Sequence, residues 1–154
     1  MARIVDIHTY MPMLIELINK GHDVNFIVTG TSMTPFLING RDTVIISPIT
    51  SSLKRGDIVF FQRQNGQYVM HRIVKVKKDG FYLVGDHQTI IEGPISRSQI
   101  FGIIHTVIRK GATITEGDFV WWLFAHVWLS VIPLRKIVLK LYNLIHPVND
   151  GASH

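Results

Sequence analysis

The chain has 154 residues, enough for one hydrophobic core, and 47% of them are hydrophobic, with a mean hydropathy of +0.24. A net charge of +5 and a pI near 9.7 are typical of a protein with an anionic partner, either a nucleic acid or a membrane surface, and equally of an ordinary solvated basic surface. The lack of cysteine excludes disulfides, thiolate zinc sites and a cysteine nucleophile.

Residues 1–22 are predicted to form an N-terminal amphipathic helix. Pro12 is compatible with the first turn of that helix, and Gly21 lies where the helix should end. Asp6 and Glu16 interrupt the apolar sequence, so this segment does not have the pattern of a secretory signal peptide.

The middle of the chain, residues 23–118, is predicted to form a β domain. Asn65-Gly66 is the strongest short-range hairpin signal in the chain, and Asp79-Gly80 indicates a second turn. We expect strands over residues 25–29, 43–47, 57–62, 67–77, 81–84 and 99–109.

The strand over residues 67–77 carries a histidine among apolar neighbours. By the two-residue period of a strand, Val69, His71, Ile73 and Lys75 share one face. Glu92 is expected in a loop that follows the next strand.

Residues 119–154 are predicted to form a hydrophobic and then basic amphipathic segment that associates with a membrane. The run FVWWLFAHVWLSVIPL, residues 119–134, carries all three tryptophans but is shorter than the roughly 20 residues of a straight membrane-spanning helix. A helix after Pro133 would place Lys136, Lys140 and Asn143 opposite apolar side chains, a pattern typical of attachment at a membrane interface. The alternatives are a helix folded onto the domain and a dimer contact.

Ser32 and His71 are the candidates for nucleophilic catalysis. Ser32 lies in a Gly- and Thr-rich turn, and a serine hydroxyl becomes a good nucleophile when a neighbouring base takes its proton. The histidines show no paired spacing on one helix and no Gly-rich phosphate loop is present, so no metal and no cofactor are expected. No helix-turn-helix precedes the β region, and nucleic-acid binding is therefore not expected.

Five short motifs follow one another in a fixed order. They are Ser32-Met33-Thr34-Pro35, Gly40-Arg41-Asp42-Thr43-Val44, Gly56-Asp57-Ile58-Val59, His71-Arg72 and Gly85-Asp86-His87. This order resembles the type I signal peptidases and the SOS-repressor-type autoproteases of the S24–S26 serine peptidase superfamily, over roughly residues 26 to 109. The resemblance implies a mostly β, partly barrel-like fold with helices at both ends.

The resemblance also implies roles for individual residues. Ser32 would be the nucleophile, in an oxyanion turn formed by Gly30, Thr31 and Ser32 itself, and His71 would be the general base. A histidine in place of lysine resembles the Ser-His branch found in the endoplasmic reticulum and in archaea. The third catalytic residue would be Asp86, with Glu92 as the alternative.

The predicted function is that of a serine endopeptidase that cleaves leader, signal or precursor peptides after small residues. One alternative is an SOS-repressor-type autoprotease, disfavoured by His71, by the missing DNA-binding domain and by the lack of an Ala-Gly dipeptide. Another is a non-catalytic, membrane-associated peptide-binding module, which the intact Ser32 and His71 disfavour. With no N-terminal transmembrane segment, the cytoplasmic face of a membrane is the favoured location.

Overall fold

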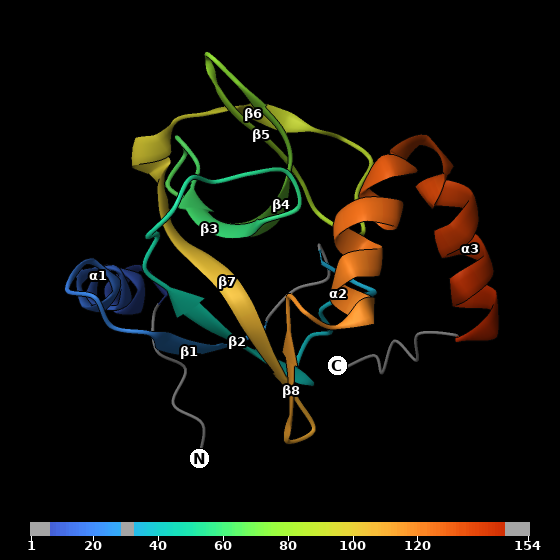
Figure 1. The fold of residues 1–154 in the computed structure, drawn as a ribbon, viewed down its shortest axis with the longest axis horizontal. Helices are drawn as coiled ribbons and strands as arrows, with labels where there is room; N and C mark the ends of the chain where they lie inside the picture. Colours follow the sequence, from blue (N-terminus) through green and yellow to red (C-terminus); the bar gives the residue numbers. More distant parts are fainter. Residues whose placement is uncertain (1–6, 29–32, 147–154) are drawn as a thin grey trace, which may run out of the picture.

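A single antiparallel sheet of eight strands lies between helices from the two ends of the chain (Figure 1). The computed structural model describes residues 7–28 and 33–146. The strands are β1 Val24–Ile27, β2 Asp42–Ser47, β3 Ile58–Gln62, β4 Tyr68–Lys77, β5 Gly80–Val84, β6 Glu92–Ile95, β7 Ile100–Arg109 and β8 Ala112–Thr115. Their order is β1-β2-β7-β3-β4-β5-β6, and β8 pairs with β7. The expected mostly β fold with helices at both ends is confirmed, and the sheet is not closed.

The N-terminal helix α1, Ile7–Asn19, packs one apolar face on the sheet. Met11, Leu14 and Ile18 are almost fully buried, and their spacing of three and four residues places them on one side of the helix. Pro12 lies inside the helix rather than in its first turn, and its side chain is exposed. Gly21 follows the helix with a φ of 93°, a left-handed conformation that glycine adopts without strain.

Two strands, β6 and β8, were not expected from the sequence. β6 contains Gly93-Pro94, which favours a turn, yet Leu83 of β5 pairs with Glu92 and Phe81 pairs with Ile95. Glu92 is therefore the first residue of an edge strand and does not lie in a loop.

The face pattern expected for β4 ends at an irregularity in the sheet. The pairing of β4 with β5 shifts between Ile73 and Lys75, so His71, Arg72, Ile73 and Val74 are all buried. Lys75 is exposed and does not share the surroundings of His71.

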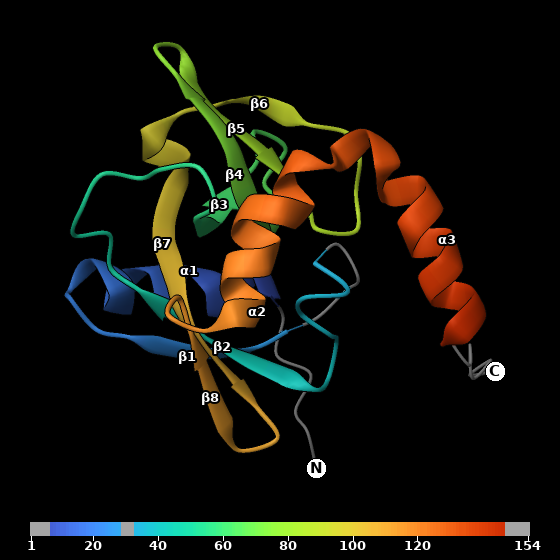
Figure 2. The same cartoon turned by 45° about the vertical axis from the view of Figure 1, so that its right-hand side comes forward.

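The C-terminal segment forms part of the main core. It consists of α2 Phe119–Trp122, a π-helical continuation Leu123–Trp128, a 3-10 turn Ile132–Leu134 and α3 Arg135–Ile145. Trp121 and Ala125 belong to the same buried cluster as Met33 and Phe36, whereas α3 lies further out (Figures 1 and 2).

Among the described residues, no single helix is long and apolar enough to cross a membrane. The pair Phe119–Trp128 and Ile132–Ile145, bent by 94°, meets the criteria of length and composition only when the two parts are taken together.

Candidate active site

His71 lies in the interior of the sheet, near the middle of β4. It pairs with Val59 of β3, and only 1% of its surface is exposed. The ring of Phe61 stands edge-on to the imidazole, with the two centroids 5.9 Å apart. Apolar packing therefore fixes the orientation of the imidazole and keeps water away from it.

Glu92 is the carboxylate next to this imidazole. Its Oε1 atom lies 2.8 Å from Nδ1 of His71. The pair is close but not aligned as an N–H···O hydrogen bond, and Nδ1 and Nε2 both lack a hydrogen-bond partner within residues 7–28 and 33–146. Nε2 is thus a buried nitrogen that can accept a proton, while Nδ1 faces the acid.

Arg63 holds Glu92 in place through two parallel contacts. Its Nε donates to Oε2 of Glu92 at 2.9 Å and its Nη2 donates to Oε1 at 2.8 Å. Such a bidentate pair fixes both the position and the plane of a carboxylate. The three side chains form a row from Arg63 through Glu92 to His71.

No sequence motif indicated Arg63. It follows the last residue of β3, directly before the turn at Asn65-Gly66, and is separated from Glu92 by 29 positions. The two residues meet because the hairpin formed by β3 and β4 approaches the edge strand β6. A search for a basic residue beside the hairpin turn would have found Arg63, but nothing in the spacing identifies its partner.

The row sets the protonation states of its members. Burial, opposed by the charge of Glu92, lowers the pKa of His71 to about 4. Burial also acts to raise the pKa of Glu92, but the hydrogen bonds from Arg63 and the proximity of His71 outweigh it and hold that pKa below its ordinary value. At neutral pH the site therefore contains a neutral imidazole beside an ionised carboxylate.

The side chain of Asp86 pairs with Arg72, whereas that of Glu92 lies beside His71. Asp86 is fully buried and forms two parallel hydrogen bonds with Arg72, from Nε at 3.0 Å and from Nη2 at 2.9 Å. Arg72 also donates to the carbonyl oxygen of Gly56. The role of Asp86 as the third catalytic residue stays a prediction, and these contacts favour the alternative, Glu92.

Gly93 fixes the backbone directly after Glu92. Its φ is 155°, and a Cβ atom at this position would lie 2.7 Å from the carbonyl oxygen of Phe81. Only glycine allows β6 to approach β5 this closely. The close approach helps to determine where the Glu92 side chain enters the site.

The predicted nucleophile turn, Gly30, Thr31 and Ser32, lies outside the described residues. The chain on either side of it is buried, at Val28 and at Met33. The carbonyl of Val28 accepts the N–H of Gly40, which ties the first side to the next turn.

A buried carboxylate holds the turn that follows Met33. Asp42 accepts hydrogen bonds from Arg41, from Arg109 and from the backbone N–H of Ile38. Burial acts to raise the pKa of Asp42, but the two guanidinium groups outweigh it and hold the pKa below its ordinary value. Arg109 also donates to the carbonyl of Phe36.

The same turn contacts the strand that carries His71. The guanidinium carbon of Arg72 lies 5.0 Å from the centre of the Phe36 ring, a cation–π contact. The segment after Ser32 and the residue next to His71 are therefore packed on each other.

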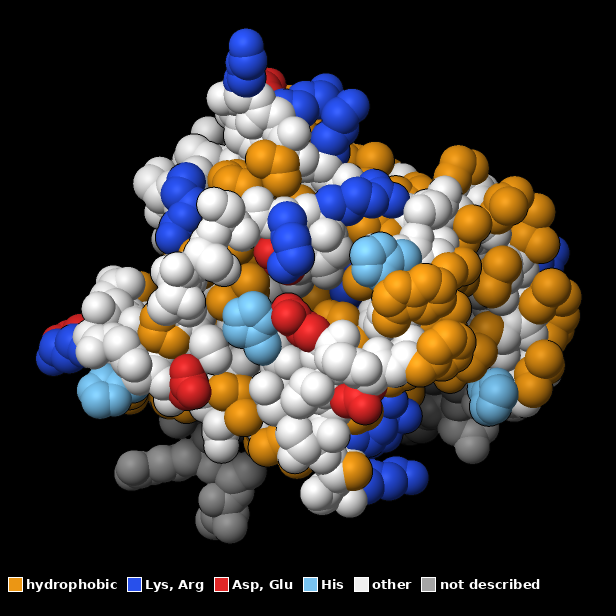
Figure 3. Space-filling model, viewed as in Figure 1, with side chains coloured by type: hydrophobic (Ala, Val, Ile, Leu, Met, Phe, Trp, Pro, Cys, Tyr) orange, Lys and Arg blue, Asp and Glu red, His pale blue; other side chains and the backbone are white. Residues whose placement is uncertain are grey.

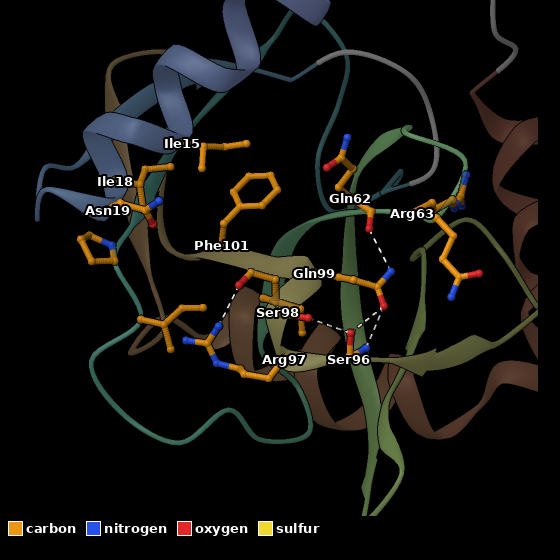
Figure 4. A pocket seen from close by; sticks show the side chains of 14 residues that line it. Ile15, Ile18, Asn19, Gln62, Arg63, Ser96, Arg97, Ser98, Gln99 and Phe101 are labelled. Atoms are coloured by element: carbon orange, nitrogen blue, oxygen red, sulfur yellow. Dashed lines mark hydrogen bonds between the residues drawn. The ribbon is translucent and has the colours of Figure 1, made fainter.

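In the described part of the chain, Arg63 lines two cavities. One, of about 460 Å³, lies between residues 87–92 and α3 and is lined by Arg63, Glu92, His87 and Leu139 among others. The second, of about 710 Å³, lies between α1 and the segment 96–101 (Figure 4). Polar side chains surround this cavity. Among them, Gln99 donates a hydrogen bond to the carbonyl oxygen of Gln62.

No group of three or more histidine or acidic side chains suited to a metal ion occurs among the residues that the structure describes. A family model described as Peptidase S24-like matches residues 2–108 of the chain, which contain the whole row from Arg63 to Glu92. No curated protein matches the chain.

Proposed function

The chain belongs to the Peptidase S24-like family, and on this basis we propose that it is a serine endopeptidase with His71 as the general base. The observation that carries the proposal is the close contact between His71 Nδ1 and Glu92 Oε1, 2.8 Å apart, in a buried setting. Ser32 is the nucleophile in this proposal, on the strength of its motif. A histidine in this role is the distinguishing feature of the Ser-His branch of the superfamily.

Each group would have a separate task. Nε2 of His71 takes the proton of the Ser32 hydroxyl while Oγ attacks the carbonyl carbon of the peptide bond. The tetrahedral intermediate collapses when the imidazolium gives this proton to the departing amine, which leaves an acyl-enzyme. Water then attacks the ester, with His71 again taking a proton, and the acid product leaves with Ser32 restored.

Glu92 would orient the imidazole and stabilise its positive charge. Nδ1 must carry a proton for Nε2 to act as a base, and a carboxylate beside Nδ1 favours this tautomer. Arg63 keeps Glu92 ionised and in plane, so that it remains an acceptor throughout the reaction. In this scheme Asp86 has a structural role, because it is the ion-pair partner of the buried Arg72.

The proposed substrates are leader, signal or precursor peptides cut after small residues. A peptide bound in extended form beside a strand alternates its side chains toward and away from the enzyme, so only every second residue is read. Met33 and Phe36 are buried in the core. A substrate pocket lined by them would be rigid and could not widen to accept a large substrate side chain. Membrane association of the substrate or of the enzyme is part of the proposal.

Purified full-length protein incubated with a peptide library tests the proposal, with cleavage read by mass spectrometry. Ser32→Ala and His71→Ala should each lower the rate by several orders of magnitude, and the double variant should be little worse than either one. His105→Ala, which removes an exposed imidazole paired with Glu116, serves as the control and should keep full activity. Cleavage of the chain itself as the only reaction would support an autoprotease, and no cleavage at all would support a peptide-binding module.

A further inference from the structure

The outer face of α3 is apolar and exposed. Ile137, Leu141 and Leu144 have 61%, 56% and 73% of their surface exposed. The remaining exposed apolar side chains of this segment are Leu134, Val138 and Ile145. In a helix of a water-soluble domain, the apolar side chains normally face the core.

The inner face of α3 is held to the domain by a buried arginine. Arg135 is fully buried and donates to the carbonyl oxygens of Gly85, Gln88 and Trp128. Leu139, one turn later, is the other buried side chain of this helix. Charged hydrogen bonds thus hold the helix with its apolar face directed outward.

The segment before α3 extends the same surface. Phe119 and Trp122 are stacked, with their ring centroids 5.9 Å apart, and are 74% and 49% exposed. Figure 3 shows hydrophobic side chains gathered over α2 and α3 on one side of the molecule. We call this set, Phe119, Trp122, Leu134, Ile137, Val138, Leu141, Leu144 and Ile145, the apolar face.

The charged side chains exposed on α3 are all cationic, whereas Glu116 and Asp118 lie at the other end of the apolar face, before Phe119. Residues 119–146 contain no Asp or Glu, but they contain Arg135, Lys136 and Lys140. Lys136 and Lys140 are exposed and lie along one flank of α3, beside the cavity that it shares with His87. A surface that is apolar in the middle and cationic at its edge complements anionic headgroups above acyl chains.

We infer that the apolar face is a lipid-binding surface, on which the protein lies in the plane of an anionic membrane. Aromatic and branched side chains enter the boundary between headgroups and acyl chains, while Lys136 and Lys140 extend to the phosphates. Only one side of each helix is exposed and apolar, as in helices that lie in an interface. The inference rests on exposed side chains and charge and is independent of the peptidase activity.

Such docking would place the cavity beside Glu92 directly behind α3, on the inner side of the helix that contacts the bilayer. That cavity is lined by Lys136 and Leu139 of α3 on one side and by Glu92 and Arg63 on the other. Membrane binding would in this way restrict the enzyme to membrane-proximal chains.

Cosedimentation of the full-length protein with vesicles tests the inference. Vesicles of phosphatidylglycerol and phosphatidylcholine should bind it more strongly than vesicles of phosphatidylcholine alone. The double variant Ile137→Gln and Leu141→Gln should weaken binding at least tenfold. Lys136→Gln with Lys140→Gln should reduce the preference for anionic vesicles roughly tenfold.

A matched control comes from exposed apolar side chains elsewhere. Met13 and Val76 are 53% and 47% exposed, on α1 and β4, and their double replacement by Gln should leave binding unchanged. Equal loss in this control, or no binding of the wild-type chain to either vesicle, overturns the inference. A dimer in sedimentation equilibrium that Ile137→Gln with Leu141→Gln dissociates, without vesicle binding, would assign the apolar face to a second copy instead.

Discussion

Trp128 donates its indole N–H to the backbone carbonyl oxygen of Asp86 at 2.8 Å. The side chain of the same Asp86 pairs with Arg72, which is next to His71 in β4. The C-terminal segment is thus attached to the turn that stabilises the strand of the candidate base.

Replacing Trp128 by Phe should destabilise the protein by about 1–3 kcal/mol, because the buried carbonyl of Asp86 loses its donor. Urea unfolding followed by circular dichroism measures the change. Trp122→Phe is the control, since Trp122 is half exposed and should give a change near zero. Equal stability of the Trp128 variant and the wild type would mean that water replaces the indole.

The two acids should respond differently to conversion into amides. Glu92→Gln should lower kcat by about 10³- to 10⁴-fold, as expected when the group that sets the histidine tautomer is lost, with little change in stability. Asp86→Asn should leave the charge of Arg72 buried without its counter-ion and cost about 3–5 kcal/mol of stability. Kinetics and urea unfolding of both variants decide the assignment. A normal rate for Glu92→Gln beside an inactive but stable Asp86→Asn would return the role to Asp86.

Arg63 is expected to be a positioning residue that acts through Glu92. Arg63→Gln should lower kcat by about tenfold to a hundredfold with little change in KM, because a displaced carboxylate no longer aligns the imidazole. Its charge also lowers the pKa of His71, so the acid limb of the rate profile should move to higher pH. Arg97→Gln, an exposed arginine of the second cavity, is the control. An unchanged pH profile in Arg63→Gln would show that the residue has only a structural role.

The pH dependence of the rate should report the buried state of His71. The neutral imidazole is the base, and with a pKa of about 4 it stays neutral well below pH 6.5. The profile of kcat/KM should therefore have its acid limb near pH 4 and a plateau by about pH 5.5. An acid limb at pH 6.5 or above would indicate that water reaches the imidazole in solution.

Stability should follow the same titration. The pKa of His71 falls from 6.5 in an unfolded chain to about 4 in the folded protein, so between these values the unfolded chain binds more protons. The free energy of unfolding that is linked to His71 is therefore fully present above pH 6.5. It decreases as the pH falls to 4, by about 3 kcal/mol in all. Comparing the free energy of unfolding of the wild type and of His71→Asn at pH 4.5 and pH 7 isolates it. A pH-independent difference between the two proteins would contradict the prediction.

Local signals predicted most of the fold. The β-branched runs and the Asn65-Gly66 turn predicted six of the eight strands because each depends on neighbouring residues. β6 was missed because Gly93-Pro94 favours a turn, and its pairing with β5 is a tertiary effect. The burial of Val74 was not expected, because it depends on the shift in the pairing of β4 with β5 after Ile73. An alternating pattern of side chains does not show such a shift.

In the candidate site, too, the sequence indicates what depends on neighbouring residues and does not indicate what depends on tertiary contacts. The contiguous motif His71-Arg72 indicates His71 as a candidate, and its role as the base stays a prediction, whereas the choice between Asp86 and Glu92 depends on which one the sheet brings to Nδ1. Arg63 has no motif, and its contact with Glu92 arises only when the hairpin meets β6. The Ser32 turn stays a prediction from its motif.

The contact of Trp121 with Phe36, with ring centroids 5.2 Å apart, also determines when this part of the core can be completed during synthesis. A nascent chain that has emerged only as far as residue 118 lacks the indole that covers the turn after Ser32, as well as Ala125 on the same cluster. The strands can pair by then, but the side chains that cover this turn are added only after Trp121 and Ala125 have left the ribosome. Completion of the core around Phe36 therefore depends on translation of residues 119–125, which follow the whole sheet in the chain.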